Sequence, residues 1–175
     1  MITMVPKDLP AKLNELISMA PQDMTSTLKS LIETSKDSEY KLRAGAERTQ
    51  CAVLRQTYVC AANDCLRAAR ELQIQITQLG EEVALIGSTS GAVNRGWAWL
   101  RGALVGNSDE AILKECGTEL DLAIQRYEDA LDELLPANVR NVLDRHVQDF
   151  LHNRTQLVQK QDPLNSTENN SQFAM

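Results

Sequence analysis

The sequence predicts an all-α protein, built as an up-and-down bundle of four long helices with one long crossover. Apolar residues make up 43% of the chain but aromatic residues only 4%, so Ala and Leu supply most of the apolar surface, which suits helix packing. Within four long segments the apolar residues recur at steps of three and four, the spacing of one helix face. Gly80 and Pro136 stand at the ends of two of these segments, where each residue type stops a helix.

Residues 1–21 are predicted to form an extension that precedes the bundle. Pro6 and Pro21 bound a short candidate helix from Asp8 to Met19, because proline is disfavoured inside a helix. The apolar face of this helix would pack on the bundle or on a partner chain. It consists of Leu9, Leu13, Leu16, Ile17 and Ala20.

The first two long helices are predicted from about Thr25 to Glu47 and from about Cys51 to Leu79. A connection of about 28 residues follows them. Its Gly- and Ser-rich stretch, residues 87–91, lacks the preceding strand and the lysine of a phosphate-binding loop, so we interpret it as a plain connecting loop. The connection also contains a shorter predicted helix, from Ala92 to Val105.

The other two long helices lie in the second half of the chain. Ser108 and Asp109 are expected to cap a helix that runs to about Leu134. After the break at Pro136, the last helix is predicted from about Asn138 to Lys160. The bundle would then comprise residues 22–160. The tail from residue 161 to 175 is rich in Asn, Ser, Thr and Gln and is expected to be disordered.

The lengths of the connections predict how the helices are arranged. Short turns join the first helix to the second and the third to the fourth, so each pair should form an antiparallel hairpin. The long connection between the second and third helices can cross back along the bundle, which makes these two helices parallel. One long crossover of this kind is the ferritin-like arrangement.

One acidic residue interrupts the buried face predicted for the first long helix. An isolated carboxylate is strongly disfavoured in an apolar interior, so Glu39 must be paired, neutralised or bound to a metal ion. The residues of this face are Leu28, Leu31, Ile32, Ser35, Glu39, Leu42 and Ala46.

The full motif of a ferritin-like di-metal site is absent from the sequence. Such a site takes a Glu from each of two helices and a Glu-x-x-His from each of the other two. Neither Glu71 nor Glu119 is followed by a histidine three residues later. Asp149 and His152 have this spacing, but helical periodicity turns His152 towards solvent. His146 is placed near the edge of the core, several turns away from Glu39.

Counting residues from the two hairpin turns brings Glu39, Asp64, Glu119 and Arg154 to one depth, to within about one turn. We prefer a structural polar layer, in which Arg154 holds Glu39 and Glu119 by charge-assisted hydrogen bonds. In that interpretation the protein needs no cofactor. The alternative is an iron or manganese site whose ligands are Glu39, Asp64 and Glu119.

Several segments carry a family resemblance. They are LIETSKDSEY at 31–40, RELQ at 70–73, QLG at 78–80, NRGW at 94–97, DEAILKEC at 109–116, YEDAL at 127–131 and LLP at 134–136. As a set they resemble a bacterial family of small ferritin-like four-helix bundles, catalogued mainly as a domain of unknown function. The resemblance covers about residues 25–160. It implies the ferritin-like fold and no established activity.

Composition narrows the partners and the location of the protein. A net charge of −6, with no run of Lys or Arg longer than two residues, argues against nucleic acid as the main partner. The sequence contains no apolar run that could span a membrane and no signal-peptide pattern at its start. Its four cysteines lack Cys-x-x-Cys spacing and are expected to be reduced. We therefore expect a cytoplasmic protein with neither zinc, nucleic acid nor a membrane as its partner.

Two tryptophans indicate self-association. Trp97 and Trp99 are two residues apart on the predicted helix at 92–105, so their side chains point about 200° apart. If Trp97 packs inwards, Trp99 faces outwards, and exposed tryptophans are enriched at protein interfaces. Together with the apolar N-terminal helix, this predicts a homodimer with Trp99 in the interface.

No catalytic residue is predicted, because neither histidine has a recognisable Ser or Cys partner. We expect a non-enzymatic cytosolic protein of structural or interaction type, which analogy with the family connects with stress. One alternative is a ferritin-like metal-binding protein or oxidase. Another is a thiol-based sensor that uses Cys60, Cys65 or Cys116.

Overall fold

The computed structural model describes the backbone of residues 9–80 and 108–171, and the side chains of residues 23–80 and 108–160. The described ranges contain four helices and no strand: α1 at Leu9–Arg48, α2 at Ala52–Gln78, α4 at Asp109–Leu131 and α5 at Ala137–Ser171. The prediction of an all-α four-helix protein is therefore confirmed. No helix in the described ranges has the length and apolar character that crossing a membrane requires.

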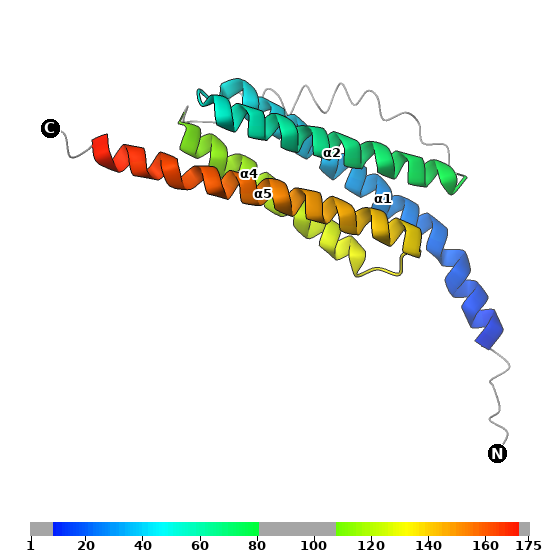
Figure 1. Ribbon diagram of the computed structural model, residues 1–175. Helices are drawn as coiled ribbons and strands as arrows, with labels where there is room; N and C mark the ends of the chain where they lie inside the picture. The colour runs from blue at the N-terminus through cyan, green and yellow to red at the C-terminus, as the bar shows by residue number, and fades with distance from the viewer. Residues whose placement is uncertain (1–8, 81–107, 172–175) are drawn as a thin grey trace, which may run out of the picture.

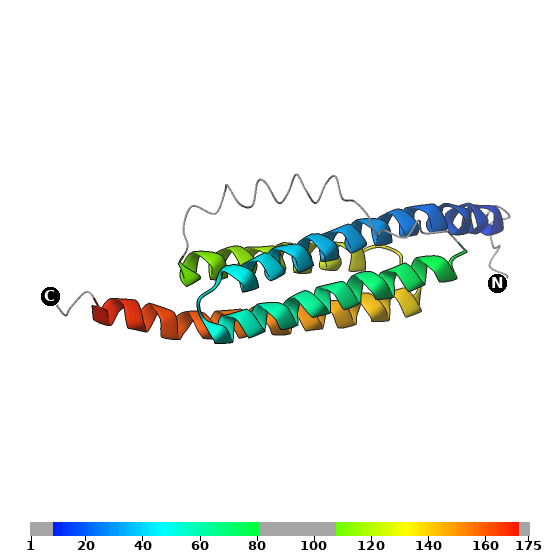
Figure 2. The same ribbon diagram turned by 90° about the horizontal axis from the view of Figure 1, so that it is seen from above.

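The four helices form a bundle in which each helix packs against two others. α1 packs against α2 and α4, and α5 packs against the same two helices. Both views show α1 and α5 running in one direction and α2 and α4 in the other (Figures 1 and 2). The end of α2 and the start of α4 therefore lie at opposite ends of the bundle. Residues 81–107, which include the helix predicted at 92–105, lie outside the described residues.

The core follows from a heptad spacing of inward-facing residues. In α1 the buried positions alternate steps of four and three, an average of 3.5 residues, which is typical of left-handed bundle packing. These positions are Met24, Leu28, Leu31, Ser35, Ser38, Leu42 and Gly45. The same spacing in α5 buries Val139, Leu143, His146, Phe150, Asn153 and Leu157.

Polar contacts hold the hairpin ends in place. The Ser108 hydroxyl accepts a hydrogen bond from the Ala111 amide at 3.2 Å, which confirms Ser108 as the cap of α4. The Asp109 carboxylate accepts from the Thr49 hydroxyl at 2.5 Å and from the Cys51 amide at 3.2 Å. These bonds tie the α1–α2 turn to the start of α4. Gly80 follows α2 with a φ of +83°, the conformation expected of a glycine that ends a helix.

Two helices are longer than predicted. The expected break at Pro21 and the start near Thr25 are both wrong, because α1 is continuous from Leu9. Proline removes one backbone hydrogen bond, but it can bend a helix without ending it. α5 likewise continues past Lys160 to Ser171, where polar composition had predicted a disordered tail. Extending a helix that already exists is much easier than starting one, so polar residues can continue a packed helix.

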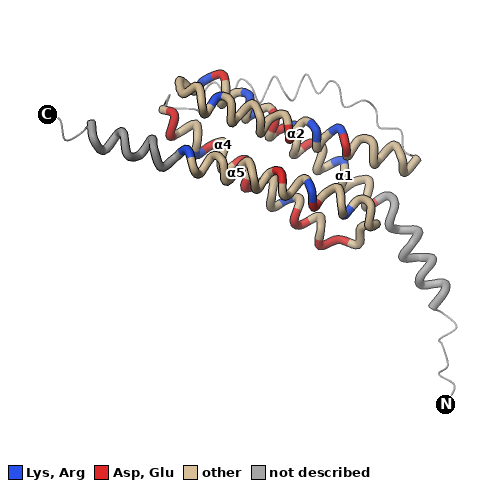
Figure 3. Tube along the Cα trace, in the orientation of Figure 1, with Lys and Arg blue, Asp and Glu red and all other residues tan. Residues whose placement is uncertain are grey.

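Charged residues of both signs lie along the described parts of all four helices (Figure 3). Several of them join neighbouring helices. Arg67 pairs with Asp149 at 2.8 Å and Arg145 pairs with Glu71 at 2.5 Å, both between α2 and α5. Lys41 pairs with Glu119 between α1 and α4. The bundle therefore has an apolar core with polar seams at α1/α4 and α2/α5, and some polar groups from these seams reach inside.

Candidate functional site in the bundle core

Each helix contributes one buried residue with a polar or thiol group to the middle of the bundle. These residues are Ser38, Cys65, Glu119 and Asn153, all at most 6% exposed. Ser38 donates a hydrogen bond to Glu119 at 3.0 Å, which places α1 and α4 at one depth. Asn153 donates to Asp64 at 2.9 Å, which does the same for α5 and α2. We call these four residues the central polar layer.

Glu119 is the charged member of the central polar layer, and α1 compensates its charge. The Lys41 ammonium donates to one carboxylate oxygen and the Ser38 hydroxyl donates to the other. Lys41 and Ser38 are three residues apart, so they lie on the same side of α1. A carboxylate that is only 6% exposed is tolerable here because it has both an opposite charge and a hydrogen bond.

Cys65 is the member of the central polar layer that α2 contributes, and its side chain has no exposed surface. Burial raises the pKa of its thiol well above the usual range, and the carboxylates of Asp64, Glu119 and Glu39 raise it further. Cys65 itself stays protonated at neutral pH, so it is a poor nucleophile.

The structure corrects the assignment of Glu39 to the core. The Glu39 side chain is 20% exposed and accepts a hydrogen bond from Arg43, one turn later on the same helix, at 2.8 Å. Ser38 occupies the inward position instead. The buried face steps from Ser35 to Ser38 to Leu42, where the sequence interpretation had stepped from Ser35 to Glu39. Both spacings are helical and both residues are polar, so hydropathy could not distinguish them.

Arg154 does not hold Glu39 and Glu119, which corrects the predicted polar layer. Arg154 pairs with Asp121 of α4 at 2.7 Å, and its side chain is 30% exposed. Its guanidinium lies over Gly117, 3.3 Å from the point where a Cβ would stand. The inward residue of α5 at this depth is its neighbour Asn153.

The predicted metal ligands also have separate partners. Asp64 lies on the outside of the layer, 26% exposed, and pairs with Arg67 at 3.1 Å. Glu39 pairs with Arg43, and Glu119 with Lys41. In residues 23–80 and 108–160, no group of three His, Cys, Asp or Glu side chains is placed to hold a metal ion. The structure therefore does not bring Glu39, Asp64 and Glu119 together as ligands.

A second buried network lies next to the central polar layer. The hydroxyls of Ser35 and Tyr127 are 2.6 Å apart and share a hydrogen bond between α1 and α4. The Tyr127 ring meets the rings of His146 and Phe150 edge to face, at centroid distances of 5.8 and 5.2 Å. Nε2 of His146 lies 2.8 Å from Glu71 of α2. This network touches all four helices.

Sequence reasoning missed the pair of His146 and Glu71. From the sequence, Glu71 lacks the histidine of a metal motif and His146 is expected at the edge of the core, whereas the structure leaves His146 only 1% exposed. The available signal was the heptad spacing of Val139, Leu143, His146 and Phe150, which puts the histidine on the buried face. Burial lowers the pKa of His146, although the Glu71 carboxylate opposes this effect.

The remaining cysteines occupy different surroundings. Cys60 is exposed on α2, beside α5, while Cys116 is buried between α4 and α1. Cys60 and Cys116 therefore lie at different interfaces of the bundle. Burial raises the pKa of Cys116 to about 12, with further contributions from Glu115 and Glu119. Neither buried thiol has the low pKa of a reactive cysteine.

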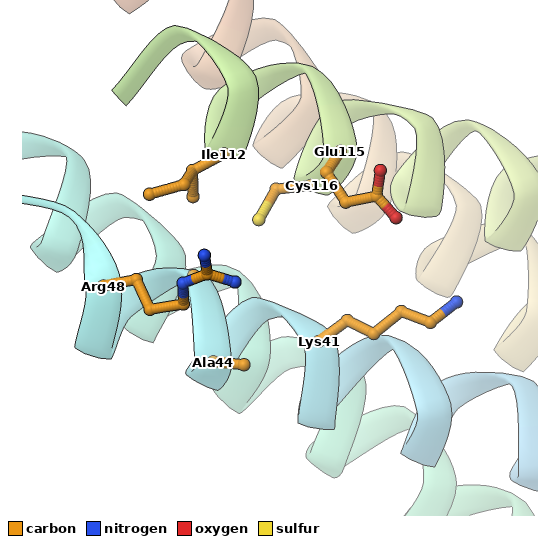
Figure 4. Close-up of a pocket in the computed structure, with 7 residues that line it drawn as sticks. Lys41, Ala44, Arg48, Ile112, Glu115 and Cys116 are labelled. Carbon is orange, nitrogen blue, oxygen red and sulfur yellow. The ribbon is translucent and has the colours of Figure 1, made fainter. Parts of the chain in front are cut away.

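A small cavity lies beside Cys116, where α1 and α4 approach closely. Ile112, Glu115 and Cys116 of α4 face Lys41, Ala44 and Arg48 of α1 across it (Figure 4). Its volume is about 20 Å³, enough for about one water molecule. The close approach depends on Gly45, because a Cβ at this position would lie 2.6 Å from the Cys116 sulfur.

Replacing Gly45 with Ala is expected to destabilise the protein by about 1–2 kcal/mol. Overpacking against Cys116 would destabilise it by about 1–3 kcal/mol, and the higher helix propensity of Ala would offset up to about 1 kcal/mol. In a Cys116→Ala background the same change should be neutral or stabilising. Urea unfolding of the four proteins measures this coupling. Equal effects of Gly45→Ala in both backgrounds would contradict the close contact.

The comparison with protein families gives this bundle a family but no activity. The model of the domain of unknown function DUF2383 matches residues 23–133. The chain belongs to the DUF2383 family. The matched region covers Ser38, Cys65 and Glu119, whereas Asn153 and His146 lie beyond it on α5. Membership in DUF2383 confirms the expected relationship to a family without a known function.

A comparison of this DUF2383 protein with curated proteins found no match. Trp99, the predicted interface residue, lies outside the described residues, and so does the rest of the helix predicted at 92–105. The interface prediction therefore remains a prediction.

Proposed function

We propose that this protein is a ferritin-like bundle of structural or interaction type that acts in the cytoplasm, without enzymatic activity and without a bound metal. The observation that carries the proposal is the pairing of Glu119 with Lys41 and Ser38. The lysine ammonium occupies the position at which a cation would otherwise compensate this carboxylate. The central polar layer then serves to specify how the four helices pack.

The identity of the other central residues supports the absence of a metal. A ferritin-like di-metal centre depends on glutamates and histidines that project inwards from all four helices. The corresponding depth here contains a serine, a protonated thiol and an amide, which are weak ligands for iron or manganese. The parallel course of α2 and α4, with a long connection between them, supports the ferritin-like arrangement.

Exposed apolar side chains support a role in protein interaction. Leu134 is 93% exposed, Val53 is 56% exposed and Ile74 is 54% exposed. Single exposed residues of this kind are common on soluble proteins, so the predicted self-association through Trp99 rests on the sequence. The four free thiols support a cytoplasmic location, where cysteines stay reduced.

Metal analysis and sedimentation of one preparation test this proposal. We expect protein loaded with Fe²⁺ or Mn²⁺ and then dialysed to keep well under one metal ion per chain, and to sediment as a dimer. Two metal ions per chain, lost in Glu119→Ala or Glu39→Ala and retained in the exposed control Glu110→Ala, would establish the metal-binding alternative. A monomeric mass at all concentrations would remove the homodimer.

A further inference from the structure

The seam between α2 and α5 contains a buried histidine whose two ring nitrogens have unequal surroundings. Nε2 of His146 lies 2.8 Å from Oε2 of Glu71. Nδ1 is fully buried and has no hydrogen-bond partner among the described residues. The neutral ring fits this arrangement, with Nε2–H donating to the carboxylate and Nδ1 carrying a lone pair. A lone pair without a partner is tolerated more easily than a buried N–H group without an acceptor.

The groups around His146 come from each helix that packs against it. α2 contributes Glu71, which Arg145 of α5 also contacts at 2.5 Å. α5 further contributes Asp149, whose carboxylate is held by Arg67 of α2 at 2.8 Å. α4 contributes the edge-on ring of Tyr127, and α1 reaches the cluster through Ser35 and its bond to Tyr127.

Protonation of His146 would place a positive charge and a new N–H group at this buried position. Glu71 and Asp149 favour the charge, while Arg145 opposes it. Burial is the largest influence, and it places the pKa of His146 below that of an exposed histidine. A proton therefore binds more readily to a state in which the ring has reached water.

We propose that His146 and Glu71 form an acid-sensitive latch between α5 and α2, which opens as the pH falls below neutrality. Opening moves the ring out of its site beside Tyr127 and lets water solvate Nδ1–H. The seam partners on either side, Arg145 and Asp149, are charged and partly exposed, so they remain solvated when the two helices separate.

The direction of the pH effect follows from linkage. Because the folded state has the lower histidine pKa, the unfolded state binds more protons as the pH falls through about 6.5. Stability is therefore complete above this pH and is lost as the pH falls through it. Glu71 acts in a separate and lower window: its pKa lies below 4.5, because the hydrogen bonds from His146 and Arg145 outweigh its burial. Its contribution is lost only as the pH falls through 4.5 and below.

The presence of only two histidines in the chain makes the test specific. Urea unfolding at pH 7.5 and 5.5 would compare the natural protein with His146→Gln and with the exposed-histidine control His152→Gln. In the natural protein and in His152→Gln, the folding equilibrium constant should fall on acidification. The fall is up to about tenfold for each unit by which folding lowers the pKa of His146. His146→Gln, which keeps a donor for Glu71 but does not titrate, should lose much less.

An NMR titration of the two histidine rings in the natural protein gives an independent measurement that needs no variant. We expect the ring of His146 to titrate below the pKa of an unperturbed histidine, about 6.5. An equal loss of stability in all three proteins, or a His146 pKa at or above about 6.5, would overturn the latch.

Discussion

Replacing Tyr127 with Ala is expected to destabilise the protein by about 3–5 kcal/mol, the range for large aromatic residues removed from a core. Tyr127 has no exposed surface and packs against both His146 and Phe150. Its removal would leave a cavity at the point where all four helices meet. Thermal and urea unfolding measure the loss.

The Tyr127→Phe variant separates packing from hydrogen bonding. Phenylalanine keeps the ring contacts but leaves the buried Ser35 hydroxyl without its partner at 2.6 Å. We expect a loss of about 1–2 kcal/mol, the magnitude for one unsatisfied buried group. Adding Ser35→Ala should recover part of this loss. A Tyr127→Phe variant as unstable as Tyr127→Ala would show that the hydrogen bond, and not the packing, dominates.

Replacing Lys41 with Met is expected to destabilise the protein by about 1–3 kcal/mol. The change leaves Glu119 buried without its opposite charge, for which losses of about 3–5 kcal/mol are typical. The smaller value reflects that Lys41 is 32% exposed, so water partly solvates the pair. Unfolding by urea at pH 7 measures the effect, with the exposed Lys114→Met on α4 as its control.

The double variant Lys41→Met with Glu119→Leu tests whether the charged pair stabilises the fold or specifies it. Replacing a buried ion pair by apolar residues is often neutral or stabilising. We therefore expect the double variant to be at least as stable as the natural protein. A double variant less stable than Lys41→Met alone would contradict this account of the pair.

The position of the central polar layer could be predicted, but the side chains that point into it could not. The depth count brought the surroundings of Glu39, Asp64, Glu119 and Arg154 to one level, and Glu119 is indeed buried there. In the other three helices the inward residue is the adjacent one: Ser38, Cys65 and Asn153. A shift of one residue turns a helix by about 100°, so it changes which residue is buried without changing the depth.

The pairing of charges was the least predictable part of the site. The sequence interpretation paired Glu119 with Arg154 and did not name Lys41, although each of these long side chains can reach several neighbours. The choice depends on the rotation of α1 and α5 about their axes. α1 turns Lys41 towards α4, whereas α5 turns Arg154 outwards to Asp121.

The sequence by itself determined the helical class, the four long helices, the cap at Ser108 and the helix end at Gly80. These features depend on local spacing and on single residue types, which act over a few positions. The tertiary structure alone decided that Ser38 replaces Glu39 in the core, that Lys41 balances Glu119 and that Glu71 is the partner of the buried His146. Each of these outcomes depends on how one helix is rotated against another, and that rotation is set by the packing of all four helices together.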